Sequence, residues 1–295
     1  MKVLVTGASG QLGYDIIKYL KSKKIDCFGP NRASLEITNF KQTEDIIRSY
    51  SPDIVIHCAA FTNVDQAELS ADECMLVNAK STINIANVCN ELGAKIVYIS
   101  TDYVFSGEEA GPYEIDSATS PISVYGFSKL VGEKEVIQRV KEHFIIRTSW
   151  AYGTNGKNFV TTMLNLGRNL ESVDVVSDQI GSPTYTHDLS IIISELMQTD
   201  RYGIYHVTNE GFCSWAEFAE QIFEYAGYKT KVNSISSEKY KRIAKRPKNS
   251  MLSKQNIEDN GFRRLPEWRD ALRRYLTEIG VEVEQMNCYS KEDGG

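Results

Sequence analysis

Short apolar runs alternate with amphipathic segments through the first half of this chain, and that alternation restricts the fold more than any other feature of the sequence. The apolar runs, which we expect to be strands, lie at residues 2–6, 25–28, 53–59, 95–100 and 143–149. The segments with one apolar helical face, which we expect to be helices, lie at about 11–21, 40–50, 74–92 and 123–140. Because parallel strands need a crossover between them, this order predicts an α/β fold with a doubly wound parallel sheet.

A glycine-rich turn, TGASGQLG at residues 6–13, joins the first expected strand to the first expected helix. Glycines at this spacing allow a tight turn and a close approach of the backbone to a pyrophosphate, which the N–H groups at the start of the helix can bind. A strand before the glycines and a helix after them are what the dinucleotide-binding motif requires. We therefore predict a Rossmann-type fold with a cofactor site at Gly7, Gly10, Gln11 and Leu12.

The end of the second expected strand indicates which dinucleotide is bound. NAD-binding proteins place an acidic residue about 20 residues after the glycines, whereas an arginine there suits the 2′-phosphate of NADP. This chain has Asn31 and Arg32 at that place, and the first acidic residue after them is Glu36. We expect NADPH as the cofactor, with NADH as the alternative, and Arg32 near the 2′-phosphate.

After about residue 150 the alternation becomes irregular, with helices expected at 158–168, 187–197, 214–226 and 268–279 and extended segments at 174–177 and 203–208. Ser214, followed three residues later by Glu217, is typical of a capping box. Since no low-complexity linker divides the chain, we predict a smaller C-terminal substrate-binding domain that is interleaved with the dinucleotide-binding domain. The predicted boundaries are 1–150 plus about 185–212 for the dinucleotide-binding domain, about 151–184 and 213–283 for the substrate-binding domain, and 284–295 for a tail.

Composition argues against several classes of function. The net charge of −6 and the pI of about 5.4 disfavour binding to nucleic acid or to an anionic membrane. No apolar stretch approaches the ~18 residues of a membrane-spanning helix, and the first residues lack the pattern of a signal peptide, so we expect a cytoplasmic protein. The histidines lack a metal-ligand spacing. No Cys-x-x-Cys pair is present, so we expect free thiols at positions 27, 58, 74, 89, 213 and 288.

A hydroxyl, a phenol and an ammonium follow one another between residues 100 and 129. Thr101 ends an expected strand, while Tyr125 and Lys129 lie four residues apart and so share one face of an expected helix. An ammonium beside a phenol favours the phenolate and lowers a pKa that is ordinarily about 10. Thr101, at the carboxyl edge of the sheet, can bind the same substrate oxygen. The three residues predict an acid–base site for a carbonyl/alcohol pair beside a nicotinamide that carries hydride.

A series of motifs gives the chain a resemblance to a known family. It resembles the extended short-chain dehydrogenase/reductases and, within them, the dTDP-4-dehydrorhamnose reductases. The motifs are TGASGQLG (6–13), AAFTNVDQAE (59–68), LVNA (76–79), STDYVF (100–105), SPISVYGFSK (120–129), RTSW (147–150), SDQIGSPT (177–184) and RPKNSMLS (246–253). The resemblance implies NADPH-dependent reduction of the 4-keto group of dTDP-4-dehydro-L-rhamnose, a nucleotide sugar, to give dTDP-L-rhamnose.

The resemblance also implies roles for single residues. Tyr125 would be the proton donor, Lys129 would position the nicotinamide ribose and tune Tyr125, and Thr101 would bind the 4-keto oxygen. Further residues would line the sugar pocket (Asp102, Tyr103, Trp150), border the cofactor (Ala59, Ala60, Thr62), contact the adenine (Glu36) or bridge backbone segments (Asn78).

Two charged features leave alternatives open. The basic segment at 239–247 is either a solvated loop or a binding site for the substrate diphosphate, with Arg246 as the main contact. Some family members dimerise through an acidic, magnesium-binding cluster, and Asp15, Asp188 and Glu278 fall at matching places. Separate carboxylates are more often surface charges, so we predict no metal site and keep a homodimer as the candidate assembly.

Two other functions compete with the reductase. An epimerase or dehydratase of nucleotide sugars could use the same scaffold, although such dehydratases carry Asp-Glu after the threonine where this chain has Asp102 and Tyr103. The second competitor is a non-catalytic regulatory subunit, because the regulatory subunit of methionine adenosyltransferase resembles the same family. The intact Thr101, Tyr125 and Lys129 argue against a purely regulatory role.

Overall fold

Six parallel strands form the central sheet of the computed structural model, which describes residues 1–283. In chain order they are β1 (Lys2–Thr6), β2 (Asp26–Phe28), β3 (Ile54–His57), β4 (Lys95–Thr101), β5 (His143–Thr148) and β10 (Gly203–His206). Across the sheet the order is β10-β5-β4-β3-β1-β2, so the chain first moves outward to β2 and then reverses to β3. The predicted doubly wound fold is confirmed. The predicted tail at 284–295, including Cys288, lies outside the described residues.

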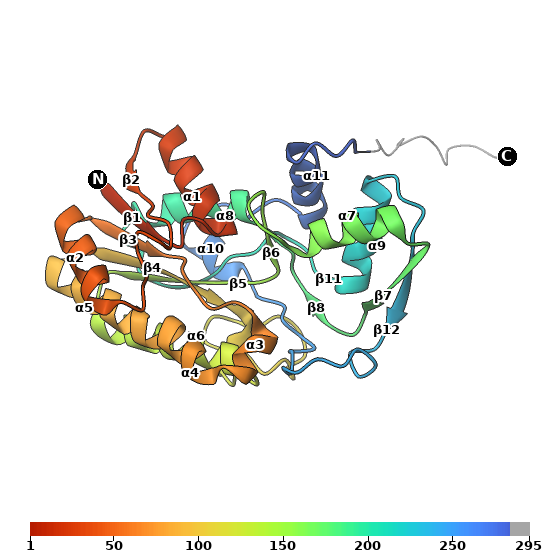
Figure 1. The fold of residues 1–295 in the computed structure, drawn as a ribbon, viewed down its shortest axis with the longest axis horizontal. Helices are drawn as coiled ribbons and strands as arrows, with labels where there is room; N and C mark the ends of the chain where they lie inside the picture. The colour runs from red at the N-terminus through yellow and green to blue at the C-terminus, as the bar shows by residue number, and fades with distance from the viewer. Residues whose placement is uncertain (284–295) are drawn as a thin grey trace.

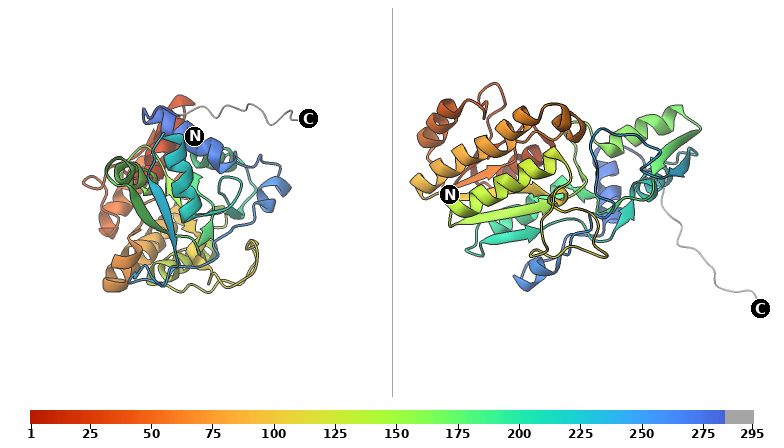
Figure 2. Two further views of the ribbon diagram at one scale, coloured as in Figure 1. Left: turned by 90° about the vertical axis from the view of Figure 1, so that its right-hand side faces the viewer. Right: turned by 90° about the horizontal axis from the view of Figure 1, so that it is seen from below.

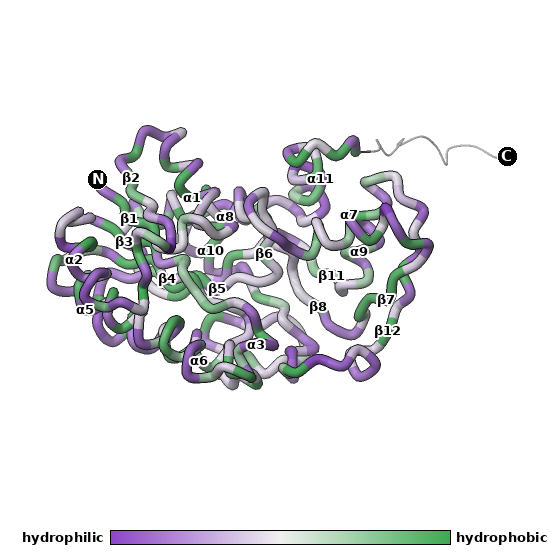
Figure 3. Tube along the Cα trace, in the orientation of Figure 1, coloured by the Kyte–Doolittle hydropathy of each residue, from purple (hydrophilic) through white to green (hydrophobic). Residues whose placement is uncertain are grey.

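Helices cover both faces of this sheet (Figure 1), and the views in Figure 2 show the same layers. One face packs against α1 (Gln11–Ser22) and α8 (Thr186–Leu196), and the other against α2 (Phe40–Tyr50), α5 (Ser81–Leu92) and α6 (Val124–Arg139). Side chains alternate along each strand, so Val3 and Val5 of β1 join one core while Leu4 joins the other. Apolar and polar residues alternate along covering helices such as α2 and α5 (Figure 3).

The helix predicted at 74–92 is present but interrupted. It consists of α4 (Ala71–Met75), a π-helical turn η1 (Leu76–Lys80) and α5. Within the π turn, the Asn78 side chain accepts a hydrogen bond from the backbone N–H of Phe61 at 2.7 Å and donates to its carbonyl at 3.1 Å. The predicted backbone-bridging role of Asn78 is therefore confirmed. The short helix α3 (Val64–Leu69) was not predicted.

The remaining elements pack around a second, strongly aromatic core on the right of Figure 1. Its helices are α7 (Phe159–Asn169), α9 (Trp215–Tyr225) and α11 (Trp268–Glu278), while α10 (Gln255–Asp259) contacts β10. Its short strand pairs are β7 (Ser172–Val176) with β12 (Lys231–Ile235), β6 (Ala151–Tyr152) with β9 (Thr184–Tyr185), and β8 (Ile180–Gly181) with β11 (Cys213–Ser214). The predicted capping box of α9 is confirmed, with reciprocal bonds between Ser214 and Glu217. No helix within the described chain is long and apolar enough to cross a membrane.

Candidate active site

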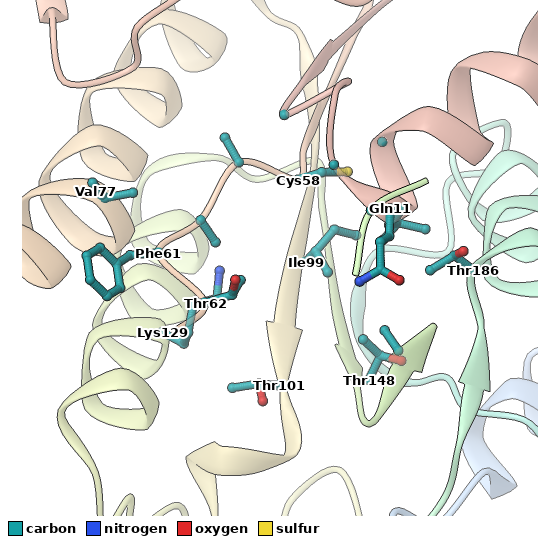
Figure 4. Close-up of a pocket in the computed structure, with 18 of the residues that line it drawn as sticks. Gln11, Cys58, Phe61, Thr62, Val77, Ile99, Thr101, Lys129, Thr148 and Thr186 are labelled. Atoms are coloured by element: carbon teal, nitrogen blue, oxygen red, sulfur yellow. The ribbon is translucent and has the colours of Figure 1, made fainter. Parts of the chain in front are cut away.

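A cavity of about 870 Å³ opens at the carboxyl ends of β1, β3, β4 and β5. This is where the strand order reverses between β1 and β3, the usual ligand position in open α/β sheets. In Figure 4, Thr62, Lys129 and Thr101 point into the same space. The predicted residues that line the cavity are Gly7, Gly10, Gln11, Leu12, Arg32, Glu36, Ala59, Ala60, Thr62, Thr101, Asp102, Tyr103, Tyr125, Lys129 and Trp150. Two predicted residues, Asn31 and Arg246, do not line it.

The glycine turn brings backbone close to backbone at the bottom of the cavity. Gly7 has φ +67°, a left-handed conformation, and a Cβ added there would lie 2.6 Å from the backbone nitrogen of Ala59. Gly10 is the N-cap of α1, and no side chain caps that helix. The first N–H groups of α1 therefore remain available to a phosphate at the positive end of the helix dipole.

The predicted 2′-phosphate contact lies on an exposed loop after β2. The Arg32 guanidinium forms an ion pair with Glu36, with 2.7 Å between Nε and Oε2, and the arginine side chain is 81% exposed. This pairing lowers the pKa of Glu36 below its ordinary value. Asn31 instead accepts a hydrogen bond from the backbone N–H of Ser34 and so shapes the loop.

The hydroxyl, phenol and ammonium predicted to act together do meet in the cavity. Thr101 ends β4, while Tyr125 occupies the first turn of α6, which Ser123 caps by accepting from the N–H of Gly126. Lys129 follows one turn later and is buried, with its Nζ 4.0 Å from the centroid of the Tyr98 ring. Helix α6 and strand β4 thus supply the three groups from adjacent elements.

Burial dominates the titration of this group. It raises the pKa of Tyr125 above its ordinary value, opposed by the hydrogen bond with Thr101. It lowers the pKa of Lys129 to about 7, opposed by the charge of Glu133. The prediction that the Lys129 ammonium lowers the pKa of Tyr125 is therefore wrong for this structure, because loss of hydration raises that pKa and Lys129 is not among the groups that lower it. Tyr125 keeps its proton at neutral pH.

Asp102 and Tyr103 form a short 3₁₀ turn, η2 (Asp102–Val104), directly after the catalytic candidate Thr101. The Thr101 hydroxyl donates to Asp102 Oδ1 at 2.9 Å and accepts from the N–H of Tyr103 at 3.2 Å. Asp102 Oδ2 is buried and has no hydrogen-bond partner among the described residues. Burial raises the pKa of Asp102 to about 7. The Tyr103 ring meets the Tyr125 ring edge-on, with 5.7 Å between centroids.

Arg246 lies outside the cavity, on the loop between β12 and α10. Its guanidinium binds Asp65 of α3 through two hydrogen bonds of 2.8 and 3.2 Å. The Asp65 carboxylate also accepts from the backbone N–H of Ala244 at 3.1 Å. These contacts lower the pKa of Asp65 to about 2. The basic segment is thus fastened to α3, and a contact of Arg246 with a diphosphate stays a prediction.

The three carboxylates considered for a metal each have protein partners. Asp15 accepts from the hydroxyl of Thr186, Asp188 binds Arg274 through two bonds of 2.7 Å, and Glu278 binds Lys18 at 2.6 Å. Within residues 1–283 no group of three or more His, Cys, Asp or Glu residues is arranged to hold a metal ion.

Sequence reasoning missed several cavity residues, of which Thr148 and Trp215 matter most for the site. Thr148 ends β5, opposite Thr101 in the sheet register, and its hydroxyl has no partner among the described residues. The RTSW motif contained this residue but gave no reason to single it out. Trp215 begins α9 and lines the cavity beside Trp150. Its only local sequence signal was the capping serine before it, which indicates a helix and not a site.

The whole described architecture matches one protein family. Residues 1–281 match the model described as the RmlD substrate binding domain. The chain belongs to the RmlD family. SpsK, a spore coat polysaccharide biosynthesis protein of Bacillus subtilis (strain 168), is 44% identical over 277 residues, which cover 94% of this chain and 97% of that protein. The dTDP-4-dehydrorhamnose reductase of Escherichia coli (strain K12) is 34% identical over 293 residues, which cover 95% of this chain and 98% of that protein.

Solved structures of the RmlD family agree with this assignment. The crystal structure of dTDP-4-dehydrorhamnose reductase from Bacillus anthracis in complex with NADP has a TM-score of 0.92 at 44% identity, covering 94% of this chain and 99% of that chain. The family resemblance predicted from the motifs is therefore confirmed. A UDP-glucose 4-epimerase from Thermus thermophilus in complex with NAD shares the fold alone, with a TM-score of 0.82 at 19% identity.

Proposed function

We propose that this chain reduces the 4-keto group of dTDP-4-dehydro-L-rhamnose with NADPH to give dTDP-L-rhamnose. The observation that carries the proposal is the convergence of Thr101, Tyr125 and Lys129 in one cavity with the glycine turn that begins α1. Relatives that are 34–36% identical over more than nine-tenths of the chain are named dTDP-4-dehydrorhamnose reductase. We infer in addition that the sheet half binds the cofactor and the C-terminal half binds the sugar nucleotide.

The residues present fit a dinucleotide phosphate. The turn at Gly7 leaves no room for a side chain, and the uncapped start of α1 can bind the pyrophosphate. Arg32 offers a cation at the ribose end, although Glu36 shares its charge. The 44% identical protein from Bacillus anthracis was solved with NADP, which supports NADPH over NADH.

The proposed chemistry divides between cofactor and protein. When bound, NADPH supplies the hydride that C4 of the sugar receives. Tyr125 donates its proton to the 4-keto oxygen, and burial suits it to this role because it remains protonated at neutral pH. Lys129, one turn along α6, holds the ribose hydroxyls and carries a proton that it can lose near pH 7. Lys129 is buried and Tyr125 is half-buried, which limits the access of water to the reacting atoms.

The experiment that tests the proposal follows NADPH absorbance with dTDP-4-dehydro-L-rhamnose for wild type and Tyr125→Phe. Loss of a general acid should lower kcat by about 10²-fold or more. Tyr202→Phe is the matched control, because its hydroxyl binds Glu142 and Asp200 on the surface, outside the cavity lining. The control should retain wild-type activity.

Two results would contradict the proposal. Wild-type protein that binds NADPH but oxidises neither NADPH nor NADH with this sugar would exclude the reaction and favour a different nucleotide sugar or a non-catalytic role. Tyr125→Phe with the activity of Tyr202→Phe would retain the reaction but remove Tyr125 as its proton donor.

A further inference from the structure

Two tryptophans that are distant in sequence stack on each other at the wall of the cavity. The rings of Trp150 and Trp215 have centroids 3.6 Å apart and planes inclined by 11°. Trp150 follows the carboxyl end of β5, an internal strand of the central sheet, whereas Trp215 is the first residue of α9 in the C-terminal half. Both line the cavity, so this stack joins the two halves of the molecule at the site itself.

The position of Trp150 places the stack at the end of the cavity where reduction would occur. Thr148 pairs with Thr101 in the register of β4 and β5, and Trp150 lies two residues beyond Thr148. The glycine turn, in contrast, follows β1, which is separated from β5 by β3 and β4. Trp150 therefore follows the strand that pairs with the Thr101 strand, while the segment after it, at Gly153, reaches the glycine turn through Gln11.

The backbone at Trp150 is in an uncommon conformation. Its φ of +46° lies in the left-handed region, which bulky residues rarely adopt. Its carbonyl accepts a hydrogen bond from the N–H of Thr184 at 3.2 Å. Such a conformation persists only where the surroundings over-determine it, and it is concentrated at functional sites.

The surroundings hold the Trp150 ring from more than one direction. A Cβ added to Gly181 would lie 2.7 Å from Cε2 and 2.9 Å from Cζ2 of Trp150, so only glycine leaves room for the ring. Trp215 covers the ring by stacking, and Phe159 in turn packs on Trp215 with 4.6 Å between centroids. The capping box at Ser214 fixes the start of the helix that carries Trp215.

We propose that Trp215 is a positioning residue that holds the Trp150 ring in place against the sugar of a nucleotide-linked substrate. The inference rests on the proposed reductase function and names a specificity-determining pair within it. A ring that is already held in its binding position loses little freedom when substrate binds, which favours affinity for the sugar and not for the cofactor. Trp215 needs no contact with the reacting atoms for this role.

The stack can be tested in solution by circular dichroism, because two closely stacked indoles give a coupled signal of paired positive and negative bands. The chain contains three tryptophans. The third, Trp268, packs edge-on against Phe218, with no aromatic contact to Trp150 or Trp215. Trp150→Phe and Trp215→Phe should each remove the entire coupled signal, whereas the control Trp268→Phe should leave it intact.

Steady-state kinetics then distinguish a role of Trp215 in sugar binding from a general role in the stability of the fold. Trp215→Ala should raise KM for dTDP-4-dehydro-L-rhamnose about tenfold, near the upper range for loss of an aromatic pair, and leave KM for NADPH within about twofold. Trp215→Phe, which keeps an aromatic ring, should recover most of the sugar affinity. The unchanged KM for NADPH serves as the check that the variant is folded.

The outcomes distinguish this inference from the proposed function. A wild-type protein that does not turn over the sugar overturns the proposed function and this role with it. Intact turnover with an unchanged sugar KM in Trp215→Ala, or an equal rise in both KM values, overturns the positioning role alone. A wild type without the coupled signal overturns the stack on which the inference is built.

Discussion

Removal of one buried charge beneath the site should destabilise the fold strongly. Glu133 of α6 and Arg147 of β5 are 1% and 3% exposed, and two hydrogen bonds of 2.8 and 3.0 Å join them. Glu133→Gln preserves the shape of the side chain but leaves the Arg147 charge buried without a counter-charge. Breaking a buried pair in this way costs about 3–5 kcal/mol. With an unfolding entropy of about 2.1 cal/mol/K per residue, the 283 described residues give about 0.6 kcal/mol/K, so Tm should fall by about 5–8 °C.

The assay is thermal unfolding at neutral pH, followed by circular dichroism at several scan rates. Glu135→Gln is the matched control, because Glu135 lies on the same helix and pairs with Arg139, but both side chains remain about a quarter exposed. Loss of a partly exposed pair costs at most about 1 kcal/mol, which corresponds to less than about 2 °C here. If Glu133→Gln lowers Tm no more than Glu135→Gln does, water or a rearranged Arg147 relieves the charge and the reasoning from burial fails.

Three further substitutions test other parts of the molecule. Gly7→Ala should weaken NADPH binding about tenfold or more in a fluorescence titration, because the residue has φ +67° and its new Cβ would meet Ala59. Asp102→Asn should raise Tm more at about pH 8 than at about pH 5. Burial raises the pKa of Asp102 to about 7, so wild type loses stability as pH rises from about 4 through 7. The same difference in Tm between variant and wild type at both pH values would contradict this reasoning. Asp65→Ala should speed tryptic cleavage within 239–247, since it releases Arg246, and equal cleavage rates would show that other contacts hold the segment.

The central sheet could be predicted because its strands are buried on both faces. Such strands are continuous apolar runs, so β1 has the predicted bounds Lys2–Thr6, and the helix α2 has the predicted bounds Phe40–Tyr50. The β12 strand could not be predicted, because Lys231–Ile235 is short, polar and mostly exposed. The π turn at Leu76–Lys80 was also hidden, since one extra residue in a helical turn hardly changes the spacing of apolar side chains.

Site residues were predictable where the chemistry is local in sequence. The glycine turn and the Tyr125–Lys129 pair each occupy one continuous segment, so spacing alone indicates their geometry. Contacts between residues that are far apart in the sequence could not be predicted from spacing. Asp65 meets Arg246 across 181 residues, and the stacking partner of Trp150 lies on a different half of the molecule. For Arg246 the sequence showed a cation but could not show that a carboxylate already binds it.

The role of Thr101 depends on where its hydroxyl proton points, and only the structure shows that direction. The sequence predicts only that Thr101 can hydrogen-bond a substrate oxygen. A hydroxyl has a single proton, and that of Thr101 points to Asp102 Oδ1 when the carboxylate is ionised. Thr101 is then an acceptor toward any other group, and its contact with the 4-keto oxygen stays a prediction. Tyr125 lines the same cavity and remains protonated at neutral pH, which supports its proposed role as the group that gives a proton to that oxygen.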